Sequence, residues 1–191
     1  MGSSHAKKRR KLAKYLRKAS KGSSFEIVVN GKGGRELQKP EMEMIIKNAK
    51  SKVPCAQIQV LLLGGNNLRY GFEDVDDFIE KCHYLCESLS KLENVHFALC
   101  SLIPSPATNV ISGPIFNETN KKLQFLAQSF PSNVSFLDLS EEFLLRNGDI
   151  DMKMFSGDKI HLKDKGTAAL ANAIFKHVQS ESVYLDFKLG L

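Results

Sequence analysis

Residues 58–67 read Ile-Gln-Val-Leu-Leu-Leu-Gly-Gly-Asn-Asn, an apolar run that ends in two glycines and two asparagines. Near-continuous apolar runs of this length are typical of strands that are covered on both faces of a parallel sheet. Gly64 and Gly65 permit a tight turn and the close approach of a substrate, and the Asn66 amide can donate a hydrogen bond to a developing oxyanion. The alternative is an ordinary turn, because Gly and Asn favour turns without any function.

Strand and helix patterns alternate on both sides of this run. Segments predicted as strands are 25–29, 58–63, 95–103 and 134–139, with 182–191 as an edge strand or a tail. Segments predicted as helices are 6–19, 40–50, 74–92, 116–130 and 163–179. The alternation over short connections predicts an α/β fold, a three-layer α/β/α domain with a parallel sheet of about five strands. Residues 1–191 are predicted to form one domain, and the loops that follow the strands should share one edge of the sheet.

Charge is unevenly distributed along the chain. The 191 residues carry a net charge of +6, yet residues 7–21 alone hold nine Lys or Arg and no acid. The rest of the chain holds 18 basic and 21 acidic residues, a net charge of −3. The ordinary interpretation is a solvated helix face, and the alternative is a weak contact with nucleic acid or an anionic membrane.

The four cysteines, Cys55, Cys82, Cys86 and Cys100, form no Cys-x-x-Cys pair. Cys82 and Cys86 share a helix face, so a metal pair is conceivable, but ordinary buried thiols are the expectation. We see no signal peptide and no apolar run of the roughly 20 residues that a membrane helix needs. The sequence therefore predicts an intracellular, cytoplasmic protein without metal or cofactor.

Residues 155–162, Phe-Ser-Gly-Asp-Lys-Ile-His-Leu, hold an acid and a base three positions apart. Asp158 and His161 can point to one place from a single loop. The carboxylate would accept the imidazole N–H and fix its tautomer, and the imidazole would act as general base on a nearby hydroxyl. Asp-x-x-His alone is a common pattern, and its position just before a terminal Ala-rich helix adds to its value.

The segment Asn30-Gly31-Lys32-Gly33-Gly34 follows a predicted strand in the same way as residues 64–67. Its glycines permit positive φ angles, or bring a backbone N–H toward an oxyanion. A phosphate loop is a third interpretation, but the Walker spacing is absent.

In this order, the three elements resemble those of the SGNH (GDSL-type) serine hydrolases. Gly34 (or Gly33) matches the family's glycine block, Gly64-Gly65-Asn66 matches its Gly-x-Asn block, and Asp158-x-x-His161 matches its last block. The resemblance spans essentially the whole chain and implies the flavodoxin-like fold of that family. It also implies an oxyanion hole made by the Asn66 amide and the backbone N–H groups of Gly34 and Ser4, with Gly64 as a further oxyanion or substrate-binding residue.

The family's first block is Gly-Asp-Ser, with the serine as nucleophile. Gly2-Ser3-Ser4 matches it with Ser3 in place of Asp, so the resemblance implies that Ser4 is the nucleophile, at the start of a helix. The alternatives are an expression-tag remnant or an N-cap serine. Two positions depart from the family, since Ser3 and Asn67 stand where it has Asp. No strand precedes Gly2, and we expect a missing upstream strand.

Together these features predict a serine esterase or acetylesterase with Ser4, His161 and Asp158 as the triad. Its substrate would be a small ester or an acetylated molecule, and its oligomeric state is open. The alternative is a catalytically inactive member used for binding or scaffolding, with the basic helix contacting RNA or membrane. A nucleotide-binding flavodoxin-like domain is a third interpretation, without a phosphate loop to support it.

Overall fold

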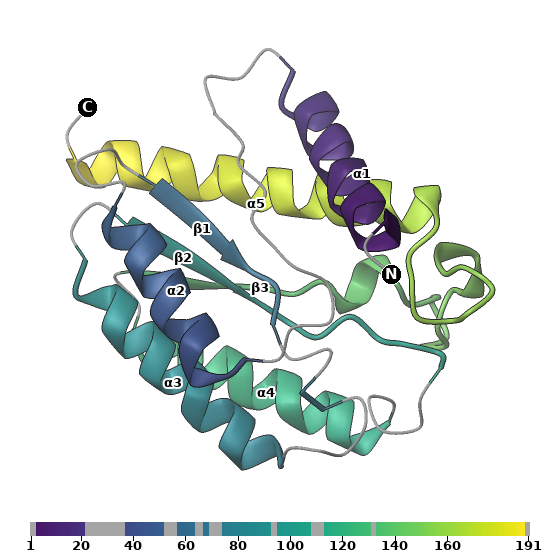
Figure 1. Cartoon of the computed structure of the whole chain (residues 1–191), viewed down its shortest axis with the longest axis horizontal. Helices are drawn as coiled ribbons and strands as arrows, with labels where there is room; N and C mark the ends of the chain where they lie inside the picture. The colour runs from purple at the N-terminus through teal and green to yellow at the C-terminus, as the bar shows by residue number, and fades with distance from the viewer. Residues whose placement is uncertain are drawn as a thin grey trace. The chain divides into compact units, whose positions relative to one another are not determined.

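The structure, a computed structural model of the chain, describes residues 3–21, 37–51, 57–63, 67–68, 74–92, 95–107, 113–130 and 133–189 (Figure 1). Side chains are described between residues 11 and 181 of these ranges, except that of Gln57. The chain divides into two compact units, residues 35–140 and residues 1–34 with 141–191. We describe each unit by itself, and the expectation of a single domain stays a prediction.

Unit 35–140 contains a parallel sheet, with its strands in the order β1-β2-β3 (Figure 1). The strands are β1 (Gln57–Leu61), β2 (Val95–Cys100) and β3 (Val134–Leu137). Leu61 lies opposite Leu99, and Cys100 lies opposite Leu137. All three strands therefore end at the same edge, as the sequence predicts. The segment 25–29 lies outside the described residues.

Three helices precede or connect these strands: α2 (Lys39–Lys50), α3 (Val75–Ser90) and α4 (Pro114–Gln128). The start of α3 is fixed by Asp74, whose carboxylate accepts the Asp76 N–H at 2.8 Å, as an N-cap residue does. Helix α4 begins two residues earlier than predicted, because Pro114 occupies a first-turn position that needs no N–H donor.

The core of unit 35–140 lies between β2 and the helices α3 and α4. Alternate residues of β2, Val95, Phe97 and Leu99, belong to one buried cluster with residues of both helices. Those helix residues are Phe78, Cys82, Leu85, Cys86, Leu89, Phe116, Leu123, Leu126 and Ala127. All six residues of β2 are buried, whereas Leu62 just after β1 is exposed. The strand buried on both faces is thus β2 rather than the run at 58–63, because β1 is a terminal strand of the described sheet.

The second unit contains α1 (Ser3–Ala19), two short 3₁₀ segments and α5 (Asp164–Leu189). The short segments are η1 (Ser140–Glu142), whose first residue is the last of unit 35–140, and η2 (Met152–Met154), and they occupy a stretch predicted to be irregular. Helix α1 packs against α5, with Leu16 buried, and Lys11 forms an ion pair with Asp164 (Figure 1). No helix within the described ranges is both long enough and apolar enough to cross a membrane.

The predicted edge strand or tail at 182–191 is corrected by the structure. Helix α5 runs through Leu189, ten residues past its predicted end at 179. The residues after 179 contain neither Gly nor Pro before Gly190, so no helix breaker stands in the sequence until that point. The weak alternation of this segment is therefore compatible with a helix.

Gly166, in the first turn of α5, allows the helix to lie against η2. A Cβ atom at this position would stand 2.4 Å from the Met154 carbonyl oxygen, a backbone atom that cannot rotate away. We expect Gly166→Ala to lower the free energy of unfolding by about 1–3 kcal/mol through this overpacking. Urea denaturation measures it, with Gly157→Ala as the control, since a Cβ at Gly157 meets nothing within 4 Å. Equal stability of the two variants would contradict the prediction.

Candidate active site

Asp158 and His161 lie on a loop between η2 and α5 that is held at both ends. The Ser156 N–H donates to the His161 carbonyl at 2.7 Å, and the Lys163 N–H donates to the Met154 carbonyl at 2.8 Å. Phe155 anchors the start of the loop, because its ring is buried against Phe143 with centroids 5.9 Å apart. The loop is therefore part of the packed unit, which favours a fixed geometry for its side chains.

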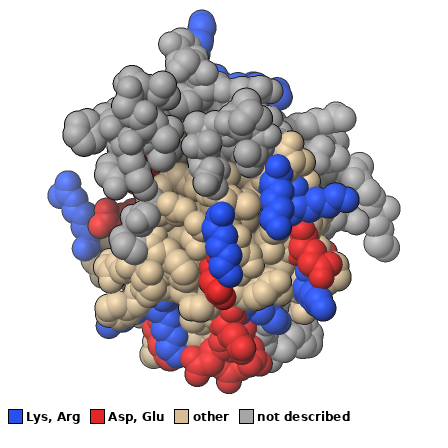
Figure 2. Space-filling view, turned by 90° about the vertical axis from the view of Figure 1, so that its left-hand side faces the viewer, with Lys and Arg blue, Asp and Glu red and all other residues tan. Residues whose placement is uncertain are grey.

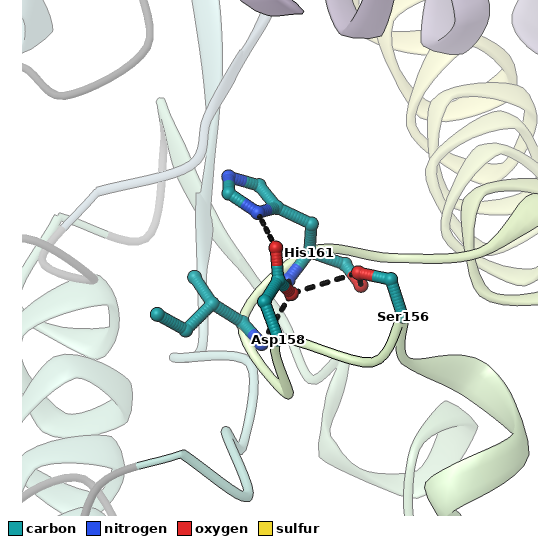
Figure 3. Close-up of polar contacts among 4 residues, drawn as sticks. Ser156, Asp158 and His161 are labelled. Atoms are coloured by element: carbon teal, nitrogen blue, oxygen red, sulfur yellow. Dashed lines mark hydrogen bonds and ion pairs between the residues drawn. The ribbon is translucent and has the colours of Figure 1, made fainter.

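The Asp158 carboxylate organises this loop (Figure 3). Its Oδ1 accepts hydrogen bonds from the Ser156 hydroxyl at 2.7 Å, the Ile160 N–H at 3.0 Å and the His161 N–H at 2.9 Å. Its Oδ2 lies 2.5 Å from Nδ1 of His161. These hydrogen bonds, from the His161 ring first, then its backbone N–H and the Ser156 hydroxyl, hold the pKa of Asp158 well below its usual range.

The His161 ring is oriented by that carboxylate. Because an ionised carboxylate only accepts hydrogen bonds, Nδ1 carries the proton and Nε2 presents its lone pair. Nε2 makes no hydrogen bond to any residue that the structure describes, and the side chain is 38% exposed. Figure 3 shows the ring directed away from the loop, with the Asp158 carboxylate below the ring in this view, between it and the loop backbone. The arrangement suits a general base that takes a proton from a hydroxyl.

The loop turns through Lys159, whose φ of 58° lies in the left-handed region. Its N–H donates to the Ser156 carbonyl at 2.9 Å, which closes the turn. This conformation brings the N–H groups of Ile160 and His161 to the same carboxylate oxygen. A non-glycine residue in this region costs about 1–2 kcal/mol, so the surrounding hydrogen bonds and packing must stabilise the turn.

Ser156 is a residue that the sequence reasoning missed. Its hydroxyl lies 2.7 Å from Asp158 Oδ1 and 2.7 Å from the His161 carbonyl oxygen, so it joins both ends of the acid–base pair. Its signal in the sequence is weak, since a serine near an aspartate is typical of many turns.

We expect Ser156→Ala to lower kcat about tenfold for any reaction that uses His161 as a base, because the carboxylate loses one of its hydrogen bonds. KM should be unchanged, since the hydroxyl orients the base rather than the substrate. Ser156→Thr, which keeps the hydroxyl, is the matched control and should retain most of the activity. A variant with lower thermal stability but unchanged kcat would indicate a purely structural role.

Ser4 lies in the first turn of α1, although its side chain is outside the described part. Positions 4 and 11 are seven residues apart, about two helical turns, so they share one face of the helix. Lys11 on that face pairs with Asp164, three residues after His161. Ser4 and His161 thus belong to the same compact unit, and their direct contact stays a prediction.

The predicted oxyanion residues Gly34, Gly64 and Asn66 lie outside the described residues, as does Gly33. The neighbouring Asn67 is described and is 1% exposed. Its side-chain oxygen accepts the Leu37 N–H at 2.9 Å, which ties the segment after β1 to the residues before α2. At this position, where the family usually has Asp, the amide therefore makes a structural contact.

The described cysteines and the sheet histidine do not suit catalysis. Cys82, Cys86 and Cys100 are buried, as expected. Burial raises the pKa of the Cys86 thiol to about 12 and also raises that of Cys100, so both stay protonated and are poor nucleophiles. His96 in β2 is buried, with Nε2 3.0 Å from the Ser135 hydroxyl, which fits a structural role.

No family model matches this chain, and neither does any curated protein. Solved structures match it over most of its length. A carbohydrate esterase family 3 protein from Talaromyces cellulolyticus has TM-score 0.67 and 16% identity, covering 90% of this chain and 89% of its own. An acetylxylan esterase from Geobacillus stearothermophilus has TM-score 0.66 and 14% identity, and the match covers 86% of this chain and 77% of the esterase. A GDSL-like lipase from Bacteroides thetaiotaomicron has TM-score 0.58 and 14% identity, and the match covers 91% of this chain and 84% of the lipase. At these identities the similarity shows a shared fold.

Proposed function

We propose, on the premise that this chain has the α/β fold of the SGNH, or GDSL-type, hydrolases, that it is a serine ester hydrolase. The observation that carries the proposal is the pair formed by Asp158 and His161, in which the carboxylate holds Nδ1 and leaves Nε2 available. The solved structures with this fold include esterases and a lipase, which supports the same reaction class.

In the proposed reaction, Ser4 Oγ attacks the acyl carbon while Nε2 of His161 takes the hydroxyl proton. Asp158 stabilises the imidazolium that forms. The oxyanion is held by the Asn66 amide and the backbone N–H groups of Gly34 and Ser4. Collapse of the tetrahedral intermediate breaks the ester bond, and the leaving alcohol takes the proton from Nε2. A water molecule, activated by the same base, then hydrolyses the acyl-serine. Apart from the ester and the water molecule, these steps use only side chains and backbone amides.

The proposed substrates are small acyl esters or acetylated molecules. Support comes from the acetylxylan esterase and the carbohydrate esterase among the similar structures. An acetyl group needs little apolar surface, so turnover should be faster with p-nitrophenyl acetate than with longer acyl chains.

The experiment that tests the proposal combines turnover with covalent labelling. The purified chain is assayed with p-nitrophenyl acetate and treated with a fluorophosphonate, and the labelled peptide is identified by mass spectrometry. Turnover above the background rate together with a label on Ser4 supports the proposal. Turnover with a label on another serine would refute the role of Ser4 as nucleophile. A folded chain with neither turnover nor label would refute the proposal that the chain is a serine ester hydrolase.

The low pKa of Asp158 sets the expected pH dependence of the proposed reaction. A carboxyl group whose folded pKa is depressed stays ionised as the pH falls past its ordinary value of about 3.9. Asp158 therefore stays ionised in this range, and its own protonation should add no break to the acid side of the kcat/KM profile down to about pH 4. The stabilisation from this carboxylate is present above its unfolded pKa and is lost as the pH falls through the folded value. A downward break close to pH 4 would show that a carboxyl group with an ordinary pKa must be ionised for turnover, which would contradict the prediction.

A further inference from the structure

The described part of α1 and the turn after it carry four exposed basic side chains on one face. Lys14, Arg17, Lys18 and Lys21 are all exposed, and their spacing of three and four residues places them on one side of the helix. We call these four residues the basic face. Leu16 is buried, on the opposite side, where α1 packs against α5. The basic face therefore points away from the packing contact of α1.

Among the described residues, these four charges have no carboxylate partner. None of their side chains forms an ion pair with a residue that the structure describes, and α1 contains no acidic residue. Other lysines do pair with carboxylates: Lys11 with Asp164, Lys91 with Glu87, Lys122 with Asp76 and Glu118, and Lys165 with Asp151. In the view of Figure 2, basic and acidic side chains also lie side by side. The basic face thus gathers four charges of one sign on one side of a helix that has no acidic residue of its own.

We propose that the basic face binds the phosphate backbone of nucleic acid, independently of the proposed ester hydrolysis. A nucleic acid offers closely spaced phosphates, and cations held in a row on a helix release the condensed counterions of such a polymer. Lys7 and Arg10 extend the same spacing toward the start of α1 in the sequence, which lengthens the row. Contacts of this kind read the backbone rather than the bases, so the binding is sequence-independent.

The packing of α1 favours nucleic acid over a membrane. A helix that lies on a bilayer buries an apolar face among the lipids, and its charges add to that contact. In α1 the apolar side already packs against α5, with Leu16 only 5% exposed. Only electrostatic attraction would then hold α1 to a membrane. The same attraction is sufficient for binding to a polynucleotide.

The test uses the full chain, a fluorescent 20-nucleotide single-stranded RNA and a 20-base-pair DNA duplex, with anisotropy measured between 50 and 200 mM KCl. One variant replaces the basic face (Lys14→Gln, Arg17→Gln, Lys18→Gln and Lys21→Gln). The matched control removes four exposed charges elsewhere (Lys39→Gln, Lys47→Gln, Lys50→Gln and Lys121→Gln), which gives the same net charge. Circular dichroism and ester hydrolysis check that both variants fold.

We expect salt-sensitive binding by the parent chain, at least a tenfold loss in the basic-face variant, and less than a threefold loss in the control. The magnitude of the slope of log K against log salt should fall by about 3.6 for the duplex, since four phosphate contacts contribute about 0.9 each. Equal losses in the two variants, or no loss in either, would overturn the proposal. Stronger binding to vesicles of phosphatidylserine and phosphatidylcholine than to both nucleic acids would overturn it in favour of a membrane. Absence of ester hydrolysis in the parent chain would leave these results unaffected.

Discussion

His161→Ala is expected to lower kcat for p-nitrophenyl acetate by about 10⁴-fold or more, because the variant has no group that can take the serine proton. The His161 side chain is partly exposed and contributes little to the core, so the variant should stay folded. Steady-state kinetics with the purified protein measures the loss. Added imidazole should restore part of the activity, since a free base can enter the space of the missing ring.

The same substitution tests Ser4 through non-additivity. Residues of a triad act as a unit, so Ser4→Ala combined with His161→Ala should be no slower than either single variant. A further loss in the double variant would show that the two residues act in separate steps. His83→Ala is the control, because His83 contacts the Phe130 ring, edge to face, in the other compact unit. It should keep the parent kcat.

Asp158→Asn is expected to lower kcat by about 10³- to 10⁴-fold while leaving KM nearly unchanged. The asparagine oxygen can still accept the N–H groups of Ile160 and His161, so the loop can keep its shape. The amide NH₂ would then face Nδ1 of His161 and favour the tautomer that carries its proton on Nε2. That tautomer cannot take a proton from the nucleophile, and the imidazolium also loses its neighbouring charge.

The control for Asp158→Asn is a measurement of its thermal stability. A melting temperature within a few degrees of the parent would assign the kinetic loss to the tautomer and the missing charge. Retention of more than a tenth of the parent kcat would contradict the role given to Asp158. Asp151, which accepts a hydrogen bond from Lys165 at 3.1 Å in the same unit, offers a comparison. Asp151→Asn should change stability more than kcat.

Local sequence patterns located most of the described elements. Strands β1, β2 and β3 and helices α1 to α4 lie where hydrophobic periodicity predicts them, with small shifts at their ends. The α/β fold, predicted from the alternation of strands and helices and from the resemblance of three short motifs, is confirmed by solved structures that cover most of the chain. The predicted end of α5 at residue 179 is wrong, because the weak alternation of residues 182–191 does not stop a helix that meets no Gly or Pro before Gly190.

The candidate site was only partly predictable. The spacing of Asp158 and His161 indicated the acid–base pair, because residues three apart can meet across a tight turn. Nothing at Lys159 indicated the left-handed conformation, which glycine adopts far more readily than lysine. The role of Ser156 depends on that turn, so it too became visible only in the structure.

The sequence alone determined the order of strands and helices, the acid–base pair and the concentration of positive charge near the start of the chain, since each is a matter of residue type and spacing. Only the tertiary structure decided which atoms meet. Lys11 pairs with Asp164 from the other end of the chain, and Phe143 and Phe155 anchor the loop of Asp158. It also decided which side of α1 is buried, and so left the basic face exposed. These outcomes depend on contacts between distant residues, which the packing of the whole unit selects and local sequence does not encode.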